Sequence, residues 1–416
     1  MTGQACAGIE GPVDVFSEMA HVPGSVLLES QSGGGYSAIY TEPFEILDSG
    51  SPFDALREAL AHNDRSSAVG FLGYEAHRFL EDSPVTAADD IGLPDSWLGL
   101  YTAPIIFASR GEGSLQDAVR PEVKSSSGPL VSSFTKPEYL EAVRRVKEYI
   151  AAGDVYQVNL SQRFSTPLEI DPWDMYLLLR ERNPAPYAAY INAGDFQIIS
   201  SSPECFLTLD PITRLVETRP IKGTRPRSAD PMEDDRLARE LESSEKDMAE
   251  NVMIVDLERN DLGRVCEFGS VAVPELAVIE SYPTVHHLVS TVTGLLRSDR
   301  DAVDLLTATF PGGSITGAPK IRAMEIIAEL EPEQRGPYAG AVGYFDLSGN
   351  LDTAITIRTI VMKDGVAHVQ AGGGIVFDSV PEREYQESVN KAQALMRAIE
   401  QAEAGAASAP KGSLGY

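Results

Sequence analysis

The sequence has few cysteines, and this scarcity excludes two classes of protein. Only Cys6, Cys205 and Cys266 occur among the 416 residues, and no two of them form a CxxC pair. A disulfide scaffold or a thiolate metal site needs more cysteines at closer spacing, so neither is expected. We assign no chemistry to the three thiols, which suit a protein of a reducing compartment.

Long apolar runs and an excess of basic charge are also missing. No apolar stretch approaches the roughly 18 residues that a spanning helix needs, and residues 1–17 lack the pattern of a secretion signal. The 62 acidic residues outnumber the 34 Lys and Arg residues, and the resulting net charge of -28 repels phosphate backbones and anionic lipid. We therefore expect a cytoplasmic protein that binds neither nucleic acid nor a membrane.

The residues that are present are typical of a folded enzyme. A hydrophobic fraction of 43% is enough to bury a sizeable core. Strands and helices occur in blocks, which predicts an α+β fold rather than a doubly wound sheet. Residues 1–108 look like a sheet-rich N-terminal lobe, 109–133 like a linker or surface loop, 134–402 like a larger second lobe, and 403–416 like a mobile tail.

The second lobe is expected to open with a helix and a strand. Thr135 is a typical N-cap for a helix over residues 139–152, which Gly153 ends, and residues 155–161 alternate like a strand. Further elements are expected as strands at 196–200 and 205–209, a helical stretch at 231–250, an antiparallel meander at 339–346, 351–362 and 366–371, and a helix at 381–402.

Two acidic helix faces are candidate metal ligands. Asp247 and Glu250 stand three residues apart, and Glu384, Glu387 and Lys391 are spaced by three and four, so each set shares one helix face. Either set alone could be an ordinary solvated or ion-paired face. Together they offer carboxylates from two helices, and Mg²⁺ prefers a few carboxylates with waters and substrate oxygens. Whether the two faces meet does not follow from the spacing.

Several other residues could bind or attack a substrate. Lys222 lies in a short turn between two prolines, where a lysine held out of water can become a nucleophile; an ordinary surface turn is the alternative. The stretches 311–317 and 371–374 lack the phosphate-loop and dinucleotide patterns but can present backbone N–H groups to a carboxylate. Arg358, in the alternating segment 354–358, can bind a carboxylate with its guanidinium.

These residues stand in segments that read SSPECFL, RPIKGT, DMAENVMIVDLERNDLGRV, YPTVHHLVSTV, FPGGSITGAPK, GAVGYF, AITIRT and GGGIVFDSVPEREYQESVNKA. Together the segments resemble the chorismate-utilising enzymes, a family that includes the large subunits of anthranilate and aminodeoxychorismate synthases and the isochorismate and salicylate synthases. The resemblance runs from about residue 134 to residue 402. It implies two large antiparallel sheets packed as a sandwich with outer helices.

The resemblance also implies roles for single residues. Glu250 and Glu387 would hold Mg²⁺, with Asp247 and Glu384 assisting through its water shell. Glu204 would be the general acid that protonates the departing C4 hydroxyl of chorismate. The residues expected to bind or line the substrate are Gln157, His287, Ser314, Arg358, Gly372, Gly374 and Lys391.

Two positions distinguish the branches of this family. By this resemblance, members that activate water have a lysine at the position of Gln157, whereas amino-forming members have a glutamine there. Anthranilate synthases have a turn similar to PIAGT. This chain has PIKGT there, with Lys222 in place of the alanine. The resemblance therefore implies amination at C4 through a covalent adduct of Lys222 at C2, on the route to 4-aminobenzoate and folate. Anthranilate formation, and a non-catalytic amino-acid sensor on the same fold, are the alternatives.

Two partners are also implied. No segment resembles a glutamine amidotransferase, so ammonia would come from a separate glutaminase subunit. Residues 27–30 resemble the tryptophan site of anthranilate synthases, while residues 183–188 are closer to the aminodeoxychorismate form. The candidates for an amino-acid site, with tryptophan as a ligand, are Glu29, Ser30, Pro186 and Tyr187.

Overall fold

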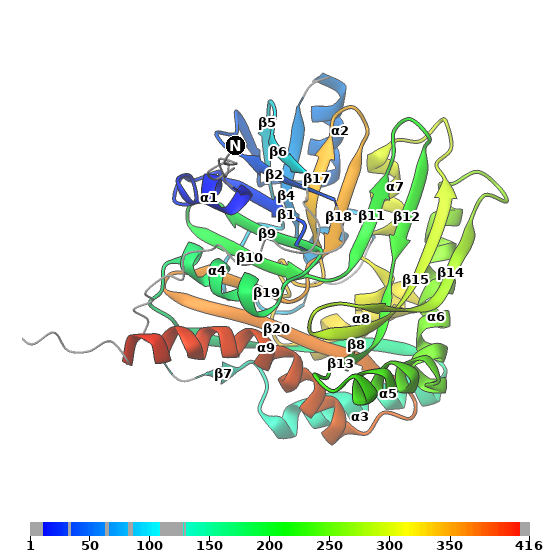
Figure 1. Ribbon diagram of the computed structural model, residues 1–416. Helices are drawn as coiled ribbons and strands as arrows, with labels where there is room; N and C mark the ends of the chain where they lie inside the picture. The colour runs from blue at the N-terminus through cyan, green and yellow to red at the C-terminus, as the bar shows by residue number, and fades with distance from the viewer. Residues whose placement is uncertain are drawn as a thin grey trace, which may run out of the picture.

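The computed structural model describes residues 11–31, 35–62, 66–81, 86–108, 128 and 130–407, and it contains two large antiparallel sheets (Figure 1). The expectations for Cys6, for most of the segment 109–133 and for the tail beyond Ala407 lie outside these residues. Residues 403–407 continue the last helix. All pairings between the named strands are antiparallel, as the α+β prediction requires.

Within the described residues each sheet has ten strands. The first runs in the order β16, β8, β20, β19, β10, β9, β1, β2, β6, with β7 beside β8, and comprises β1 (Val26–Glu29), β2 (Tyr36–Tyr40), β6 (Ile105–Ala108), β7 (Val131–Ser132), β8 (Gln157–Pro167), β9 (Tyr187–Asn192), β10 (Phe196–Ser202), β16 (Gly317–Ala318), β19 (Thr359–Lys363) and β20 (Val366–Ile375). The second runs in the order β13, β15, β12, β11, β18, β17, β4, β5, β3, with β14 beside β15, and comprises β3 (Glu45–Leu47), β4 (Ser67–Leu72), β5 (Ser96–Tyr101), β11 (Cys205–Leu209), β12 (Leu215–Arg219), β13 (Ile221–Pro226), β14 (Ala272–Ser281), β15 (Val285–Leu295), β17 (Ala341–Asp346) and β18 (Leu351–Ile355).

Helices cover the outside of this pair of sheets. In Figure 1 the long α9 lies along β20, with α3 beside it, while α5 and α6 lie against β13, β14 and β15. The helices are α1 (Pro12–Ser17), α2 (Pro52–His62), α3 (Lys136–Ala152), α4 (Pro172–Arg182), α5 (Pro231–Glu242), α6 (Glu245–Gly263), α7 (Ala302–Thr309), α8 (Lys320–Leu330) and α9 (Pro381–Ala407), with 3-10 turns η1 (Tyr74–Phe79) and η3 (Gly313–Ile315). None of the described helices is both long and apolar enough to cross a bilayer.

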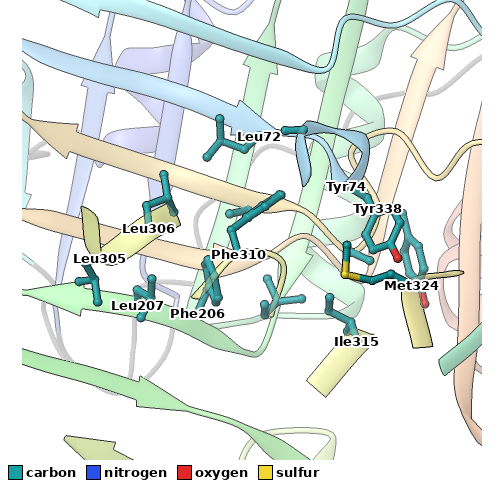
Figure 2. Close-up of a cluster of buried hydrophobic side chains, with 14 of the residues drawn as sticks. Leu72, Tyr74, Phe206, Leu207, Leu305, Leu306, Phe310, Ile315, Met324 and Tyr338 are labelled. Atoms are coloured by element: carbon teal, nitrogen blue, oxygen red, sulfur yellow. The ribbon is translucent and has the colours of Figure 1, made fainter. Parts of the chain in front are cut away.

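Apolar side chains from both sheets meet to form the core. Val26 and Ile198 of the first sheet pack with Phe71, Trp97 and Val342 of the second, all buried. Figure 2 shows a neighbouring cluster in which side chains of β11, α7 and α8 meet. Burying apolar area of this kind supplies most of the stability of a domain, at roughly 25 cal/mol per Å². Strands that precede the segment 109–133 and strands that follow it occur together in each of the two sheets. The lobe boundary predicted at this segment stays a prediction.

Helix α3 shows how closely local signals can fix an element. Thr135 caps it, with the Glu138 N–H donating to the Thr135 side chain and the Glu138 carboxylate accepting from the Thr135 N–H. Gly153 follows in the left-handed conformation, at φ 85°. The expected helix is confirmed, because a side-chain cap and a glycine end satisfy the free backbone groups of a helix. The strand expected at 155–161 is β8, which begins at Gln157 and runs longer.

Two expected elements are divided in the structure. The helical stretch 231–250 is broken at Ser243, and Ser244 caps the second helix, so one prediction covers two helices, α5 and α6. The segment 351–362 forms β18 in one sheet and β19 in the other, so the prediction of a single meander was wrong. Arg358 lies at this crossover with φ 53°, in the left-handed region, rather than in a strand. The alternating pattern could not show the crossover because both halves are buried strands.

The glycine-rich stretch 371–374 lies within β20, which extends beyond the strand expected at 366–371. Gly372 pairs with Ser161 of β8, and a Cβ at Gly372 would lie 2.3 Å from the Leu160 carbonyl oxygen. Close backbone approach therefore explains this glycine. The stretch still reaches the cavity described below, as part of a strand.

A buried ion pair ties the first sheet to the loop around η3. The Arg335 guanidinium binds the Glu331 carboxylate at 2.7 Å, and both side chains are nearly inaccessible. It also donates to the carbonyl oxygens of Asn159 and Ile315, at 2.6 and 2.9 Å. The backbone N–H of Arg335 donates to Glu75, in η1. One cation thus contacts β8, η3 and the end of α8.

Replacing Arg335 with Met should destabilise the protein strongly, because Glu331 would keep a buried charge without its partner. Loss of one partner of a buried pair costs about 3–5 kcal/mol. Denaturant unfolding measures the effect, and Arg144→Met is the matched control, since Arg144 forms a solvent-exposed pair with Glu141. The control should lose less than about 1 kcal/mol. Similar small losses in both variants would contradict the assigned role of Arg335.

Candidate functional site

A cavity of about 1040 Å³ lies where β13, β15 and β20 meet α6 and α9. It is lined by side chains and backbone from segments far apart in the sequence. The sequence-predicted residues that the structure brings together in its wall are Glu204, Lys222, Asp247, Glu250, His287, Ser314, Arg358, Gly372, Gly374, Glu384, Glu387 and Lys391. The two acidic helix faces, on α6 and α9, therefore do meet.

The cavity is far less negative than the chain around it. Its wall carries five carboxylates and five cationic side chains, which are Glu204, Asp247, Glu250, Glu384 and Glu387 against Lys222, Arg225, Lys246, Arg358 and Lys391. The chain as a whole has a net charge of -28. Such local compensation allows an anionic ligand to enter an acidic protein.

Lys222 extends from β13, and a backbone contact holds its amine. Its Nζ donates to the Ser314 carbonyl oxygen at 2.7 Å. Burial lowers the pKa of Lys222 from its ordinary value, although Glu204 and Glu250 oppose the shift and Lys391 adds to it. The expected surface-turn alternative is therefore not what the structure shows, because this amine faces the cavity. A lysine with a depressed pKa is a candidate nucleophile.

Glu204 lies between β10 and β11, and it is only 4% exposed. One carboxylate oxygen accepts from the Ile221 backbone N–H at 3.4 Å, and the Ser314 side chain also hydrogen-bonds to the carboxylate. Burial raises the pKa of Glu204, while Ser314 and Lys222 act in the opposite direction. The carboxyl group is thus suited to give and take a proton beside Lys222.

The acids of α6 and α9 occupy the other end of the cavity. Burial raises the pKa of Glu250 and of Glu384, with neighbouring carboxylates adding to both shifts, whereas Lys391 lowers the pKa of Glu387. Asp247 pairs with Arg225 at 3.1 Å, and Glu387 pairs with Lys391 at 2.8 Å. One oxygen of Glu250 is buried without a hydrogen-bond partner among the described residues. Even with Arg225 and Lys391 nearby, the four carboxylates leave this end short of positive charge.

Lys246 supplies part of that charge and was not predicted from the sequence. Its ammonium lies 3.6 Å from the Glu250 carboxylate. Burial disfavours its charge, but Glu250, Glu384, Glu387 and Asp247 raise its pKa on balance. Its position one helical turn before Glu250 is the signal that could have found it. Arg225 and Tyr338 also line the cavity and were missed.

The residues fit a divalent cation that is completed by a ligand. No three acidic, His or Cys side chains in the described ranges form a ready-made metal site. However, one Glu250 oxygen has no hydrogen-bond partner among the described residues, and Glu384, Glu387 and Lys391 surround the backbone of Gly373 within 3.5–3.7 Å of where a Cβ would stand. Mg²⁺ needs only one or two carboxylates when waters and substrate oxygens supply the rest. Carboxylate oxygens are donors of the kind that Mg²⁺ prefers, so the residues present fit this ion.

Lys391 and Arg358 form the cationic side of the cavity. The Lys391 Nζ donates to the Gly372 carbonyl oxygen at 3.0 Å. Among the described residues the Arg358 guanidinium makes one hydrogen bond, to the Lys391 carbonyl oxygen at 3.3 Å, and burial lowers its pKa. Most N–H groups of Arg358 are thus left for a ligand, and guanidinium binds carboxylates well.

His287 lies on β15, and its Nδ1 is 2.9 Å from the Thr224 hydroxyl. Burial, with Arg358 nearby, lowers the pKa of His287 to about 4. The imidazole is therefore neutral near pH 7 and can donate or accept a hydrogen bond without adding charge. Its neighbour His286 instead faces Asp234, at 3.1 Å.

Gln157 lies behind the wall rather than in it. It is fully buried, and neither its amide nitrogen nor its amide oxygen has a hydrogen-bond partner among the described residues. A Cβ at Gly374 would stand 2.8 Å from the Gln157 Cδ. Buried amides are almost always hydrogen-bonded, so a small polar ligand behind Gly374 would satisfy this one.

The residues expected to form an amino-acid site lie away from this cavity. Residues 29–31 and 185–188 are neighbours, since Gln31 and Ala185 exchange hydrogen bonds. The Glu29 carboxylate, however, is bound by Arg180 at 2.7 Å and by the Tyr176 hydroxyl at 2.7 Å, on the face covered by α4. Tyr187 packs on the opposite face, between the sheets. The four residues therefore do not face one common space.

Known proteins resemble this chain over most of its length. Residues 38–397 match the family model for chorismate binding enzymes. Anthranilate synthase component 1 from Thermus thermophilus is 41% identical, covering 96% of this chain and 97% of its own. Aminodeoxychorismate synthase component 1 from Bacillus subtilis is also 41% identical, covering 91% and 92%. The crystal structure of anthranilate synthase component I from Streptococcus pneumoniae superposes with a TM-score of 0.77 at 34% identity, covering 95% and 100%.

Replacing Glu250 with Gln should raise the melting temperature of the metal-free protein at pH 7. The folded-state pKa of Glu250 is raised, so its ionisation disfavours the folded state once the pH exceeds the unfolded value. The gain should vanish at about pH 4, where the carboxyl is protonated in both states. Glu242→Gln, at an exposed position on α5, is the control and should show no such pH dependence. A lower melting temperature for Glu250→Gln at pH 7 would show that the ionised Glu250 carboxylate does not destabilise the folded state.

Proposed function

Because the chain belongs to the family of chorismate-binding enzymes, we propose that it is a transferase that places ammonia on C4 of chorismate, giving 4-amino-4-deoxychorismate. Overall identity cannot choose between the two amino-forming reactions, since relatives named for each are 41% identical. The observation that carries the choice is the position of Lys222. Its amine lies in the cavity, next to Glu204. Anthranilate-forming members have a turn similar to PIAGT, with alanine at this position, and so have no amine there.

Lys222 and Glu204 can together allow ammonia to replace the C4 hydroxyl of the ring. The free amine of Lys222 forms a bond to C2, the two conjugated double bonds of the ring each shift by one position, and the C4 hydroxyl leaves. Glu204, having taken the proton of the Lys222 ammonium, donates it to the departing hydroxyl, which becomes water. Ammonia then forms a bond to C4, the double bond shifts back, and the bond from C2 to Lys222 breaks. The enolpyruvyl group stays on the ring throughout.

The cationic side of the cavity would bind the two carboxylates of chorismate. Arg358 has free N–H groups, and Lys391 is held by the Gly372 carbonyl oxygen. Glu250 and Glu387 would hold Mg²⁺, which when bound neutralises a substrate carboxylate beside them. Ser314 and His287 line the space between these ends. Each substrate charge then has a partner of opposite sign.

Ammonia supply is the second part of the proposal. The name component 1, carried by both kinds of relative, refers to an enzyme of more than one component. We assign the other component as a glutaminase that releases ammonia to this chain. The neutral amide of Gln157 behind Gly374 suits an ammonia nucleophile, whereas water-activating members have a basic lysine there. We place the reaction in the cytoplasm, on the route to 4-aminobenzoate and folate.

An amino-acid ligand between the sheets has support of its own. Tyr187 lies near Cys205 and Asp352, and burial raises the pKa of Asp352 to about 6. One oxygen of Asp352 is buried without a hydrogen-bond partner in the described residues. The ammonium group of a bound amino acid, such as tryptophan, would satisfy it. In this proposal Glu29 takes a structural part, through Arg180.

The reaction itself is the first test. Purified protein incubated with chorismate, Mg²⁺ and ammonium should give a product that keeps the enolpyruvyl carbons, detected by its mass. Glutamine in place of ammonium should give none, and EDTA or Glu387→Ala should remove most activity, with Glu242→Ala as the matched exposed control. Release of pyruvate with anthranilate would instead identify the anthranilate-forming reaction. Full activity in chelated buffer would exclude the metal.

Replacing Lys222 with Ala tests the covalent step. Formation of aminodeoxychorismate should fall by about a thousandfold or more, because the nucleophile is lost. Ammonia could then attack C2 directly, giving slow anthranilate-type or aminoisochorismate product. Lys136→Ala removes an exposed lysine at the start of α3 and should leave the rate unchanged. Near-normal rates in Lys222→Ala, with no adduct trapped on the wild-type lysine, would refute both mechanism and assignment.

A further inference from the structure

A buried glutamate stands behind the loop that positions the two catalytic groups. Glu258, on α6, is 2% exposed. One of its oxygens accepts a hydrogen bond from the Gly313 backbone N–H at 3.2 Å. The other oxygen is buried and has no hydrogen-bond partner among the described residues. Glu258 does not line the cavity, so it cannot touch a substrate there.

The loop held by Glu258 contacts both groups that act on the substrate. Ser314 follows Gly313 directly, its carbonyl oxygen accepts from the Lys222 Nζ at 2.7 Å, and its side chain hydrogen-bonds to Glu204. On its far side the loop is fixed at the Ile315 carbonyl oxygen by Asn159 and Arg335. A shift at Gly313 would therefore move the acceptor that orients Lys222.

The charges around Glu258 leave it without a counter-ion. Lys320 of α8, a cation that acts on Glu258, is paired with Asp261, which is also 3.4 Å from the more exposed Arg264. Glu204 lies on the side of the cavity and is a further acid. Burial, Asp261 and Glu204 raise the pKa of Glu258 to about 8, against Lys320 and the Gly313 N–H. A protonated Glu258 leaves the buried pair of Asp261 and Lys320 electrically balanced.

We propose that Glu258 is a positioning residue for this reaction, which as a neutral acid holds the Gly313 N–H and so fixes Ser314 against Lys222 and Glu204. The proposal rests on the proposed function, since it gives those two residues their roles. Ionised Glu258 would place a new negative charge behind the loop. That charge would stabilise the ammonium form of Lys222 and the protonated form of Glu204, so the lysine would be inert and Glu204 a weaker acid.

The pH dependence of turnover separates this role from a merely structural one. Wild-type turnover of chorismate should decline above about pH 8. Glu258→Gln keeps the shape and the acceptor but cannot ionise, so it should stay within about threefold of wild type at pH 7 and lose the alkaline decline. Asp261→Asn, which frees Lys320 to stabilise ionised Glu258, should move the decline to lower pH. An unchanged profile in Glu258→Gln, or uniform loss of activity at every pH, would overturn the proposal.

A second measurement needs neither a variant nor turnover. Carbonyl-¹³C and ¹⁵N labelling of glycine selects the amides of glycines that follow glycine, which are Gly34, Gly35, Gly313, Gly373 and Gly374. One of these signals should titrate with a midpoint near pH 8, as the acceptor of the Gly313 N–H ionises. No titration between about pH 7 and 9 would overturn the proposal. A titrating amide in a protein that makes anthranilate would instead reject the proposed product while keeping the assignment of Glu258.

Discussion

The fold around the cavity depends on satisfying one buried cation. Arg335 has almost no contact with solvent, and a buried guanidinium is tolerated only when it is paired and fully hydrogen-bonded. Its partners are the Glu331 carboxylate and the carbonyl oxygens of Asn159 and Ile315, while Glu75 binds its backbone. These groups come from α8, β8, the loop at η3 and η1. In the folded protein, Arg335 therefore fixes the positions of these groups relative to one another.

Much of the site could be predicted because its parts are local. Asp247 and Glu250 share a face of α6 by spacing alone, and Glu384, Glu387 and Lys391 do so on α9. The prediction of carboxylates from two helices needed only the 3.6-residue period. The fold class was confirmed for the same reason, since capped helices and alternating strands are short-range signals. That the two faces meet depends on long-range packing, which a single sequence does not encode in its spacing.

The errors arise where burial or topology overrides a local pattern. Residues 351–362 alternate like one strand, yet the chain changes sheets at Arg358, and this change turns the guanidinium toward the cavity. The strand expected at 366–371 continues through Gly372, because a residue without a side chain fits the close approach to the Leu160 carbonyl oxygen. Glu29 looked like a ligand-binding acid, but Arg180 is close enough in space to bind it. Contacts between distant residues decide all three.

Burial acts on Lys222 and Glu204 together, and this has a consequence for reactivity. Removing both groups from water lowers the pKa of the lysine and raises that of the glutamate. Both shifts favour a neutral amine beside a neutral acid over an ion pair. In the proposed reaction the neutral pair is the reactive state, because the amine is then a nucleophile and the acid can protonate a leaving hydroxyl. Burial in the cavity wall thus shifts both protonation equilibria, and the loop at Ser314 contacts both groups.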